Sequence, residues 1–150
     1  MPLDSNGIWQ YEESETAAPV STMLNRLAKS VSDAVAPLVT DTGWVNVSLA
    51  SGITAISGYP LQVRRIGPIV YLQGRVQGLP ANTQTTITGS SLDAEFVPGV
   101  PTFDLGLIPN GALPSSQYAR VFVQSNGNIG VRTNTNTDAY IMGNWVAGDA

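Results

Sequence analysis

The dipeptide Gly67-Pro68 constrains this chain more than any other feature of its sequence. It separates two runs rich in β-branched and apolar residues, 61–66 and 69–77. Glycine tolerates the positive φ that the first central position of a type II′ turn requires, and proline fits the negative φ of the second position. An apolar helix across this point is disfavoured, because proline removes a helical hydrogen bond. The sequence therefore predicts an antiparallel hairpin with a two-residue loop.

The turn also fixes which residues of this hairpin face each other. Ile66 lies opposite Ile69, so that Arg64 pairs with Tyr71 two steps further out. Because side chains alternate between the two faces of a sheet, one face is apolar and the other polar. The apolar face, which we expect to form the inner wall of a β-barrel, contains Leu61, Val63, Val70 and Leu72. The polar face contains Gln62, Arg64, Tyr71 and Gln73.

A second hairpin is predicted around Ser125-Asn126-Gly127. Two registers are open to it: a two-residue Asn-Gly turn, or a three-residue loop with Gly127 in the left-handed conformation. Only the three-residue loop places four β-branched residues on one face, namely Val121, Val123, Ile129 and Val131. Because burial decides register, we predict this second arrangement. Phe122 then projects from the opposite face with Arg120 and Arg132, and we expect it to contact a neighbouring subunit or a ligand.

Shorter strand patterns fill the rest of the region between the two hairpins and beyond them. In 102–108, Phe103, Leu105 and Leu107 alternate with Asp104 and Gly106. Only 12% of the residues are charged, and 15 Gly and 10 Pro suit short strands joined by turns. The expected fold class is mainly β: a short N-terminal helix followed by an antiparallel β-barrel or sandwich over 41–150. Its other strands are expected at 44–49, 85–88, 102–108 and 139–146, with a proline-rich loop at 90–101.

The sequence predicts a helix from about Thr16 to Val35 with a narrow apolar stripe, within a segment assigned to 16–40. Thr16 is the candidate N-cap, Pro19 falls in the first turn, and Pro37 is expected to end the helix. Asp41-Thr42-Gly43 is then expected to act as a linker. The stripe, called the seam below, has the 4, 3, 4, 3, 4 spacing of a heptad repeat. The seam consists of Val20, Leu24, Leu27, Val31, Ala34 and Leu38.

Two interpretations of the seam are open. A helix that packs on its own domain usually shows a wider apolar face, so we favour a short coiled coil between copies of this chain. The alternative is packing against the β-region of the same chain. Fewer than three heptads do not hold an oligomer alone, so a coiled coil would require the β-region to associate as well. The seam does not fix the number of chains.

The first fifteen residues combine aromatic and acidic side chains. They contain four of the eleven acidic residues of the chain. Ile8, Trp9 and Tyr11 form an aromatic and apolar cluster, which we interpret as a docking segment for another protein. The alternatives are an unstructured chain end, or acids that complement the positive end of the helix. The segment lacks the basic and apolar regions of a signal peptide, so we expect a protein made and kept without export.

The residues that are absent exclude several function classes. There is no Cys and no His, so thiolate nucleophiles, Cys-ligated metals and the usual base near neutral pH are missing. The net charge is −4 and Lys29 is the only lysine, which gives no nucleic-acid footprint. No apolar run is long enough to span a membrane. We expect no cofactor, no metal site and no catalytic site; a glycosidase would need paired carboxylates from Asp93, Glu95, Asp104 and Asp138.

The ordered set of motifs resembles a known family. GWVNVSL, LQVRRIGPIVYLQGRVQG, a proline-bearing stretch with FVP, YARVFVQSNGNIGVRT and a final NWVA follow one another. The set is similar to the C-terminal β-barrel head domains of trimeric receptor-binding and tail-fibre proteins of tailed bacteriophages. The opening GIWQYEESETAAPVSTMLNRLA resembles the start of small phage minor tail proteins. The resemblance implies a homotrimer in which 1–15 docks onto other virion proteins, 16–40 forms a short coiled-coil stem, and 41–150 forms the head.

The resemblance also implies a function and a place. A virion protein made in the host cytoplasm would lie at the tail tip and bind the host surface, with cell-wall carbohydrate as the usual ligand. The candidate receptor-binding residues are Arg132, Asp138 and Tyr140; the alternative for each is the commoner role of a solvated loop or strand-surface residue. Because the stem is short, a capsid decoration or head-fibre protein without a receptor is the alternative. An enzyme that cuts host glycans is the third hypothesis.

Overall fold

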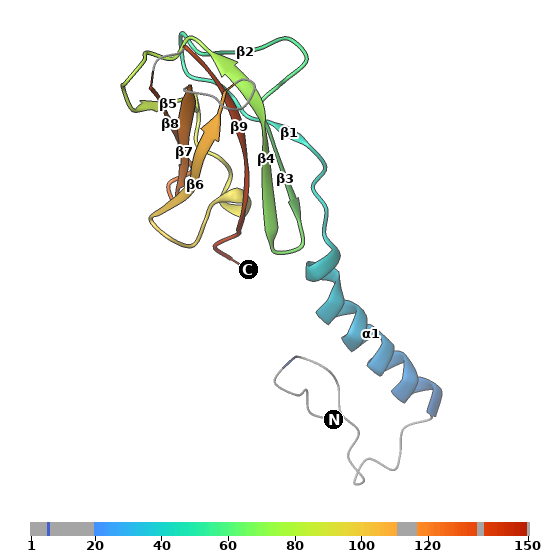
Figure 1. Cartoon of the computed structure of the whole chain (residues 1–150). Helices are drawn as coiled ribbons and strands as arrows, with labels where there is room; N and C mark the ends of the chain where they lie inside the picture. Colours follow the sequence, from blue (N-terminus) through green and yellow to red (C-terminus); the bar gives the residue numbers. More distant parts are fainter. Residues whose placement is uncertain (1–5, 7–19, 111–116, 135–136, 150) are drawn as a thin grey trace. The chain divides into compact units, whose positions relative to one another are not determined.

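The computed structural model describes residues 6, 20–110, 117–134 and 137–149 (Figure 1). It divides into two units, Met1–Thr40 and Asp41–Ala150; the second is called the β-unit below. The first unit contains the helix α1 (Val20–Val39). The β-unit contains, in chain order, β1 (Val45–Asn46), β2 (Thr54–Ala55), β3 (Gln62–Ile66), β4 (Ile69–Gln77), β5 (Thr85–Thr86), the 3-10 turn η1 (Ala94–Phe96), β6 (Thr102–Pro109), β7 (Tyr118–Gln124), β8 (Ile129–Thr133) and β9 (Asp138–Val146).

The helix α1 extends further than the sequence predicts. Pro37 lies inside its last turn and the helix ends at Val39, so the expectation that Pro37 ends it is wrong. Pro37 lacks the N–H that a helical residue donates to the carbonyl four positions earlier, yet the helix continues past it to Val39; the Thr40 hydroxyl donates to the Ala36 carbonyl at 3.0 Å. The predicted start at Thr16 and Pro19 lies outside the described residues. In the described part of the chain, no helix is long and apolar enough to cross a membrane.

The seam of α1 is open within the described structure. No residue of the helix is buried, and Leu38 is 62% exposed at its C-terminal end. The Lys29–Asp33 ion pair, one turn apart at 2.6 Å, lies on the exposed polar side. The helix of 20 residues thus carries one apolar stripe and, in the described structure, has no buried side chain.

Two antiparallel sheets make up the β-unit, and Figure 1 shows them facing each other. In the first sheet the order is β1-β3-β4-β2, and β9 pairs with the other edge of β4; in the second sheet the order is β5-β8-β7-β6. The apolar side chains of both inner faces meet between the sheets. The mainly β fold with antiparallel sheets and an N-terminal helix, predicted from the sequence, is confirmed.

The central hairpin is the one that Gly67-Pro68 predicts. Ile66 faces Ile69, Arg64 faces Tyr71, and Gly67 has a φ of 56°. The four residues of its apolar face are all buried. They contact the core that the two sheets enclose, as the alternation of the sequence requires.

The second hairpin has the predicted three-residue loop. Val123 pairs with Ile129 and Val121 with Val131, and all four side chains are fully buried. Gly127 has a φ of 85°, and a Cβ at this position would lie 2.7 Å from the backbone of Leu92. Glycine is therefore required here both by the backbone conformation and by the close packing of the loop against residue 92.

The predicted alternation of buried and exposed side chains in β6 is wrong for the second half of the strand. The pairing with β7 shifts register between Asp104 and Gly106, which marks a β-bulge. After the bulge, Ile108 is buried and Leu107 is 63% exposed. An extra residue reverses which side chains face the core, so Leu107 lies on the outer face of the second sheet.

The segment before β1 is not a free linker. Asp41 forms an isolated bridge with Ile66, and the Thr42 N–H donates to the Arg65 carbonyl at 3.0 Å. The guanidinium of Arg64 donates to both carboxylate oxygens of Asp41, at 2.9 and 2.5 Å. The expected strand 44–49 is shorter than predicted, because only Val45–Asn46 pairs regularly with β3.

The Asp41–Arg64 pair leads to a prediction about pH. Hydrogen bonding from Arg64, and then from the Gly43 N–H, lowers the pKa of Asp41 from 3.8 to about 2. Because the folded pKa lies below the unfolded one, the stabilisation is complete above about pH 4 and is lost as the pH falls towards 2. In an NMR titration we expect the Asp41 carboxyl to titrate near 2 and Arg64→Gln to raise its pKa. Lys29→Gln serves as the charge-matched control; an ordinary pKa in the unsubstituted protein would contradict the prediction.

Candidate functional site

A groove of about 560 Å³ opens on the outer face of the first sheet. We call it the tyrosine groove. Its wall comes from the turn before β3, from the middle of β4 and from β9. A Cβ at Gly74 would lie 2.7 Å from the Leu61 Cα, so glycine at 74 allows the chain at 60–61 to approach the sheet. The groove is lined by Gly58, Tyr59, Pro60, Gln62, Gln73, Gly74, Tyr140, Ile141 and Met142.

Two tyrosines define the shape of the groove. The rings of Tyr59 and Tyr140 meet edge to face, with centroids 6.4 Å apart and planes at 88°. Tyr59 is 51% exposed, and its backbone is fixed because its carbonyl accepts from the Arg75 N–H at 3.1 Å. Exposed aromatic rings with fixed backbones provide apolar contact area at low entropic cost. The polar groups beside them are the amides of Gln62 and Gln73.

The ring of Tyr140 also contacts Arg75. The Arg75 guanidinium lies 4.5 Å from the ring centroid, and its Nη1 donates to the Tyr140 hydroxyl at 3.3 Å. Its Nη2 donates to Asp138 Oδ2 at 2.5 Å, while Asn110 donates to Asp138 Oδ1 at 3.1 Å. Asp138 therefore neutralises Arg75 and holds it against the ring of Tyr140. The groove presents no unpaired charge from this pair.

The structure separates the three receptor-binding candidates that the sequence predicts. Tyr140 lines the tyrosine groove, and Asp138 pairs with Arg75, which contacts Tyr140. Arg132 lies on β8, in the other sheet, where it lines a different cavity. Tyr59, which also lines the tyrosine groove, was not predicted from the sequence. The Ser57-Gly58 turn indicated that a loop precedes Tyr59. That Tyr59 lies close to Tyr140, however, depends on the pairing of β4 with β9.

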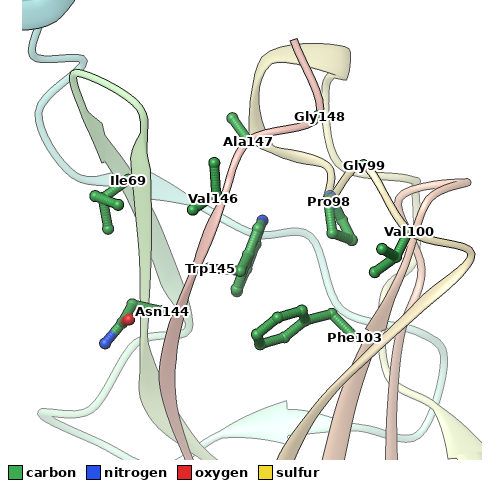
Figure 2. Close-up of a pocket in the computed structure, with 10 residues that line it drawn as sticks. All are labelled: Ile69, Pro98, Gly99, Val100, Phe103, Asn144, Trp145, Val146, Ala147 and Gly148. Atoms are coloured by element: carbon green, nitrogen blue, oxygen red, sulfur yellow. The ribbon is translucent and has the colours of Figure 1, made fainter. Parts of the chain in front are cut away.

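A second groove, of about 510 Å³, lies beside the C-terminal end of β9 and the segment 98–100 (Figure 2). We call it the edge groove. In Figure 2, Asn144 and Val146 lie on one side of β9, and Trp145, Pro98 and Phe103 lie on the other. The edge groove is lined by Ile69, Pro98, Gly99, Val100, Phe103, Asn144, Trp145, Val146, Ala147 and Gly148.

An apolar row of side chains adjoins the edge groove. Cross-strand pairing places Ile66 opposite Ile69 and Ile69 opposite Val146. Ile66 and Val146 are exposed, and Ile69 is partly buried. A contiguous exposed row of this kind, next to an apolar groove, is typical of a surface that contacts another protein.

Phe122 is covered by its own chain. It is 6% exposed, and a Cβ at its cross-strand neighbour Gly130 would lie only 2.1 Å from its ring. The Arg120 guanidinium lies 5.8 Å from the ring centroid. The glycine at 130 thus leaves room for the ring to lie flat on the sheet, and little of its surface remains for a neighbouring subunit or a ligand. This differs from the expectation drawn from the sequence.

The carboxylates considered for glycan cleavage lie in different surroundings. Asp93 and Glu95 are exposed; Asp93 precedes the η1 turn and Glu95 lies in it. Asp104 forms an ion pair with Arg120 at 2.6 Å, and Asp138 forms one with Arg75. Within the described ranges, no group of three or more His, Cys, Asp or Glu residues could hold a metal ion. The docking candidates Ile8, Trp9 and Tyr11 lie outside the described residues.

The arrangement of these sheets is the fold of bacteriophage receptor-binding head domains. The structure is similar to the head domain of lactococcal phage bIL170, with a TM-score of 0.50 and 20% identity over 69% of this chain and 96% of that chain. It is also similar to the receptor-binding protein gp15 of Listeria phage PSA, with a TM-score of 0.51 and 13% identity over 90% of this chain and 88% of that chain. No protein-family model and no curated protein matches the sequence.

Proposed function

We propose that this chain is a receptor-binding protein of a tailed bacteriophage, which attaches to a saccharide of the host surface through the tyrosine groove. The observation that carries the proposal is the fold shared with phage receptor-binding proteins. The groove adds a site of suitable chemistry on that fold. Its volume, about 560 Å³, lies within the range of small-molecule sites.

The chemistry of the tyrosine groove fits a neutral ligand with many hydroxyl groups. The ring of Tyr59 offers an apolar face for the C–H groups of a sugar, and its hydroxyl can donate or accept. The amides of Gln62 and Gln73 provide both donors and acceptors. Because Asp138 neutralises Arg75, the groove has no net charge from that pair to select an anion.

The proposal includes a homotrimer. Two surfaces support it: the open seam of α1, and the apolar row of Ile66, Ile69 and Val146 beside the edge groove. A coiled coil this short requires the β-regions of the copies to associate as well. The apolar row lies on the β-unit and would provide that contact. We further propose that Ile8, Trp9 and Tyr11 dock the protein onto another virion protein at the tail tip.

Replacing Tyr59 by alanine tests the tyrosine groove. We expect binding of the labelled protein to host cells, and to their purified wall polysaccharide, to weaken about tenfold, which corresponds to about 1.4 kcal/mol. The physical reason is loss of the exposed ring that forms one wall of the groove. The matched control is Tyr71→Ala, which removes an exposed tyrosine from the same outer face but from outside the groove.

Two outcomes would contradict the proposal. Equal binding by the Tyr59→Ala variant and the unsubstituted protein would exclude the tyrosine groove as the site. Absence of any binding to host cells or wall polysaccharide, together with incorporation into the capsid, would instead indicate a decoration protein.

A further inference from the structure

We propose that a second cavity, on the outer face of the other sheet, binds an oxyanion group, a carboxylate or a phosphate. We call this cavity the arginine pocket; its volume is about 250 Å³. The proposal does not depend on the tyrosine groove, which lies on the first sheet. The arginine pocket is lined by Asn82, Leu107, Tyr118, Arg120, Arg132, Thr133 and Asn134.

The first observation is the register of β7 and β8, which places Arg120 directly opposite Arg132. Like charges directly opposite each other destabilise a sheet, unless a counter-charge lies near them. Asp104 supplies one: its Oδ2 accepts from Nε and Nη2 of Arg120, at 2.8 and 2.6 Å. Asp104 thereby offsets the positive charge of Arg120, and the positive charge of Arg132 remains.

The second observation is a contrast among the arginines of the β-unit. Arg64, Arg65 and Arg75 form ion pairs with Asp41, Asp149 and Asp138, as Arg120 does with Asp104. Across the ranges that the structure describes, Arg132 alone among the arginines of the β-unit forms no ion pair. It is exposed, and no acidic side chain lines the pocket that it shares with Arg120.

The surroundings of Arg132 suit a bound group rather than bare solvent. Asn134 is fixed at the rim, because its side-chain oxygen accepts from the Tyr118 N–H at 2.9 Å. Asn82 adopts a φ of 57° and is anchored by its N–H to the Thr133 carbonyl at 2.8 Å. The planar guanidinium of Arg132 presents parallel N–H donors that match the two oxygens of a carboxylate or phosphate.

The net charge of the chain does not favour the binding of an anion. The chain carries −4, so its overall field repels anions. Binding at the arginine pocket would therefore depend on the local pair of guanidinium groups. The exposed Leu107 and Tyr118 beside them would contact the apolar part of a ligand that carries the anionic group.

The test is an NMR titration of the full chain with inorganic phosphate at constant ionic strength, monitored at the Nε–Hε signals of the arginines. The chain has six arginines, so the spectrum is simple to assign by substitution. We expect saturable shifts at Arg132 and Arg120, while Arg64, which Asp41 holds, does not move. Arg132→Gln should abolish the shift at Arg120. Arg132→Lys, which keeps the positive charge but loses the parallel N–H donors of the guanidinium, should weaken phosphate binding several-fold.

Arg64→Gln is the matched control, since it removes an arginine from the outer face of the first sheet and should leave phosphate binding unchanged. Because Arg132 is exposed, its substitution should not unfold the protein, which the remaining spectrum verifies. Parallel titrations with methyl phosphate and with acetate identify which oxyanion binds more tightly. Equal shifts at all exposed arginines, no shift at Arg132, or the same shifts with sodium chloride would overturn the proposal.

Discussion

Replacing Trp145 by alanine is expected to lower the free energy of unfolding by about 3–5 kcal/mol. Trp145 is 2% exposed and lies between β9 and the segment that carries Phe103 (Figure 2). Its indole N–H donates to the Phe96 carbonyl at 2.8 Å and so ties β9 to the η1 turn. The substitution removes the largest apolar side chain of β9 from the core and leaves that carbonyl without its donor.

Chemical denaturation at one fixed protein concentration measures this loss, since the stability of an oligomer depends on concentration. Trp145→Phe separates the two contributions, because it keeps an aromatic ring and removes the hydrogen bond. Leaving the Phe96 carbonyl unpaired should cost about 1–3 kcal/mol. Trp44→Ala is the matched surface control: its ring is exposed, 5.8 Å from the Arg64 guanidinium, so we expect a loss below about 1 kcal/mol. Equal losses for Trp44→Ala and Trp145→Ala would contradict the placement of Trp145.

The largest effect on assembly is expected from Leu27→Asp, at the middle of the seam of α1. In a homotrimer the substitution brings three carboxylates together at one layer, where desolvation and mutual repulsion oppose association. We expect the mass measured by light scattering to fall from three times 15.8 kDa to 15.8 kDa. Far-UV circular dichroism should retain the β-sheet signal, because no residue of the helix is buried in the structure.

Asn25→Asp is the control for this experiment, since it adds the same charge on the side of the helix away from the seam. It should leave the mass unchanged. A Leu27→Asp variant that remains a trimer would exclude the seam as the contact. If the variant instead keeps its mass but loses thermal stability of the β-unit, the helix packs on its own domain, which is the alternative that the sequence left open.

Both hairpins were predictable in register because each is determined locally. Gly67-Pro68 and Gly127 specify the loops, and alternation of β-branched residues then selects the buried face. The β-bulge in β6 was not predictable in this way. The residues Asp104 to Ile108 fit either phase of alternation, and the choice is made by the burial of Ile108 against the opposite sheet. Pro37 was expected to end the helix because it cannot donate to the carbonyl four positions earlier, but the helix continues to Val39.

The candidate site was predictable only in part, because it depends on contacts distant in sequence. Tyr140 was identified as a polar aromatic beside a late loop, but its neighbour Tyr59 comes from 81 positions earlier in the chain. The pairing of β4 with β9 brings them together, and no local pattern specifies it. The same pairing places Asp138 next to Arg75, the arginine that contacts the Tyr140 ring.

The ladder between β4 and β9 has a consequence for the order of events during synthesis. It joins nine residue pairs, from Ile69–Val146 to Gln77–Asp138, and one whole edge of β4 depends on it. About 60 residues separate Gln77 from Asp138, which a ribosome adds in about 3–12 seconds. During that interval the backbone N–H and C=O groups on this edge of β4 have no native partner. The apolar side chains of Val70, Leu72 and Val76 lie on the same strand. Nascent chains crowded on one messenger are therefore most exposed to mispairing through β4.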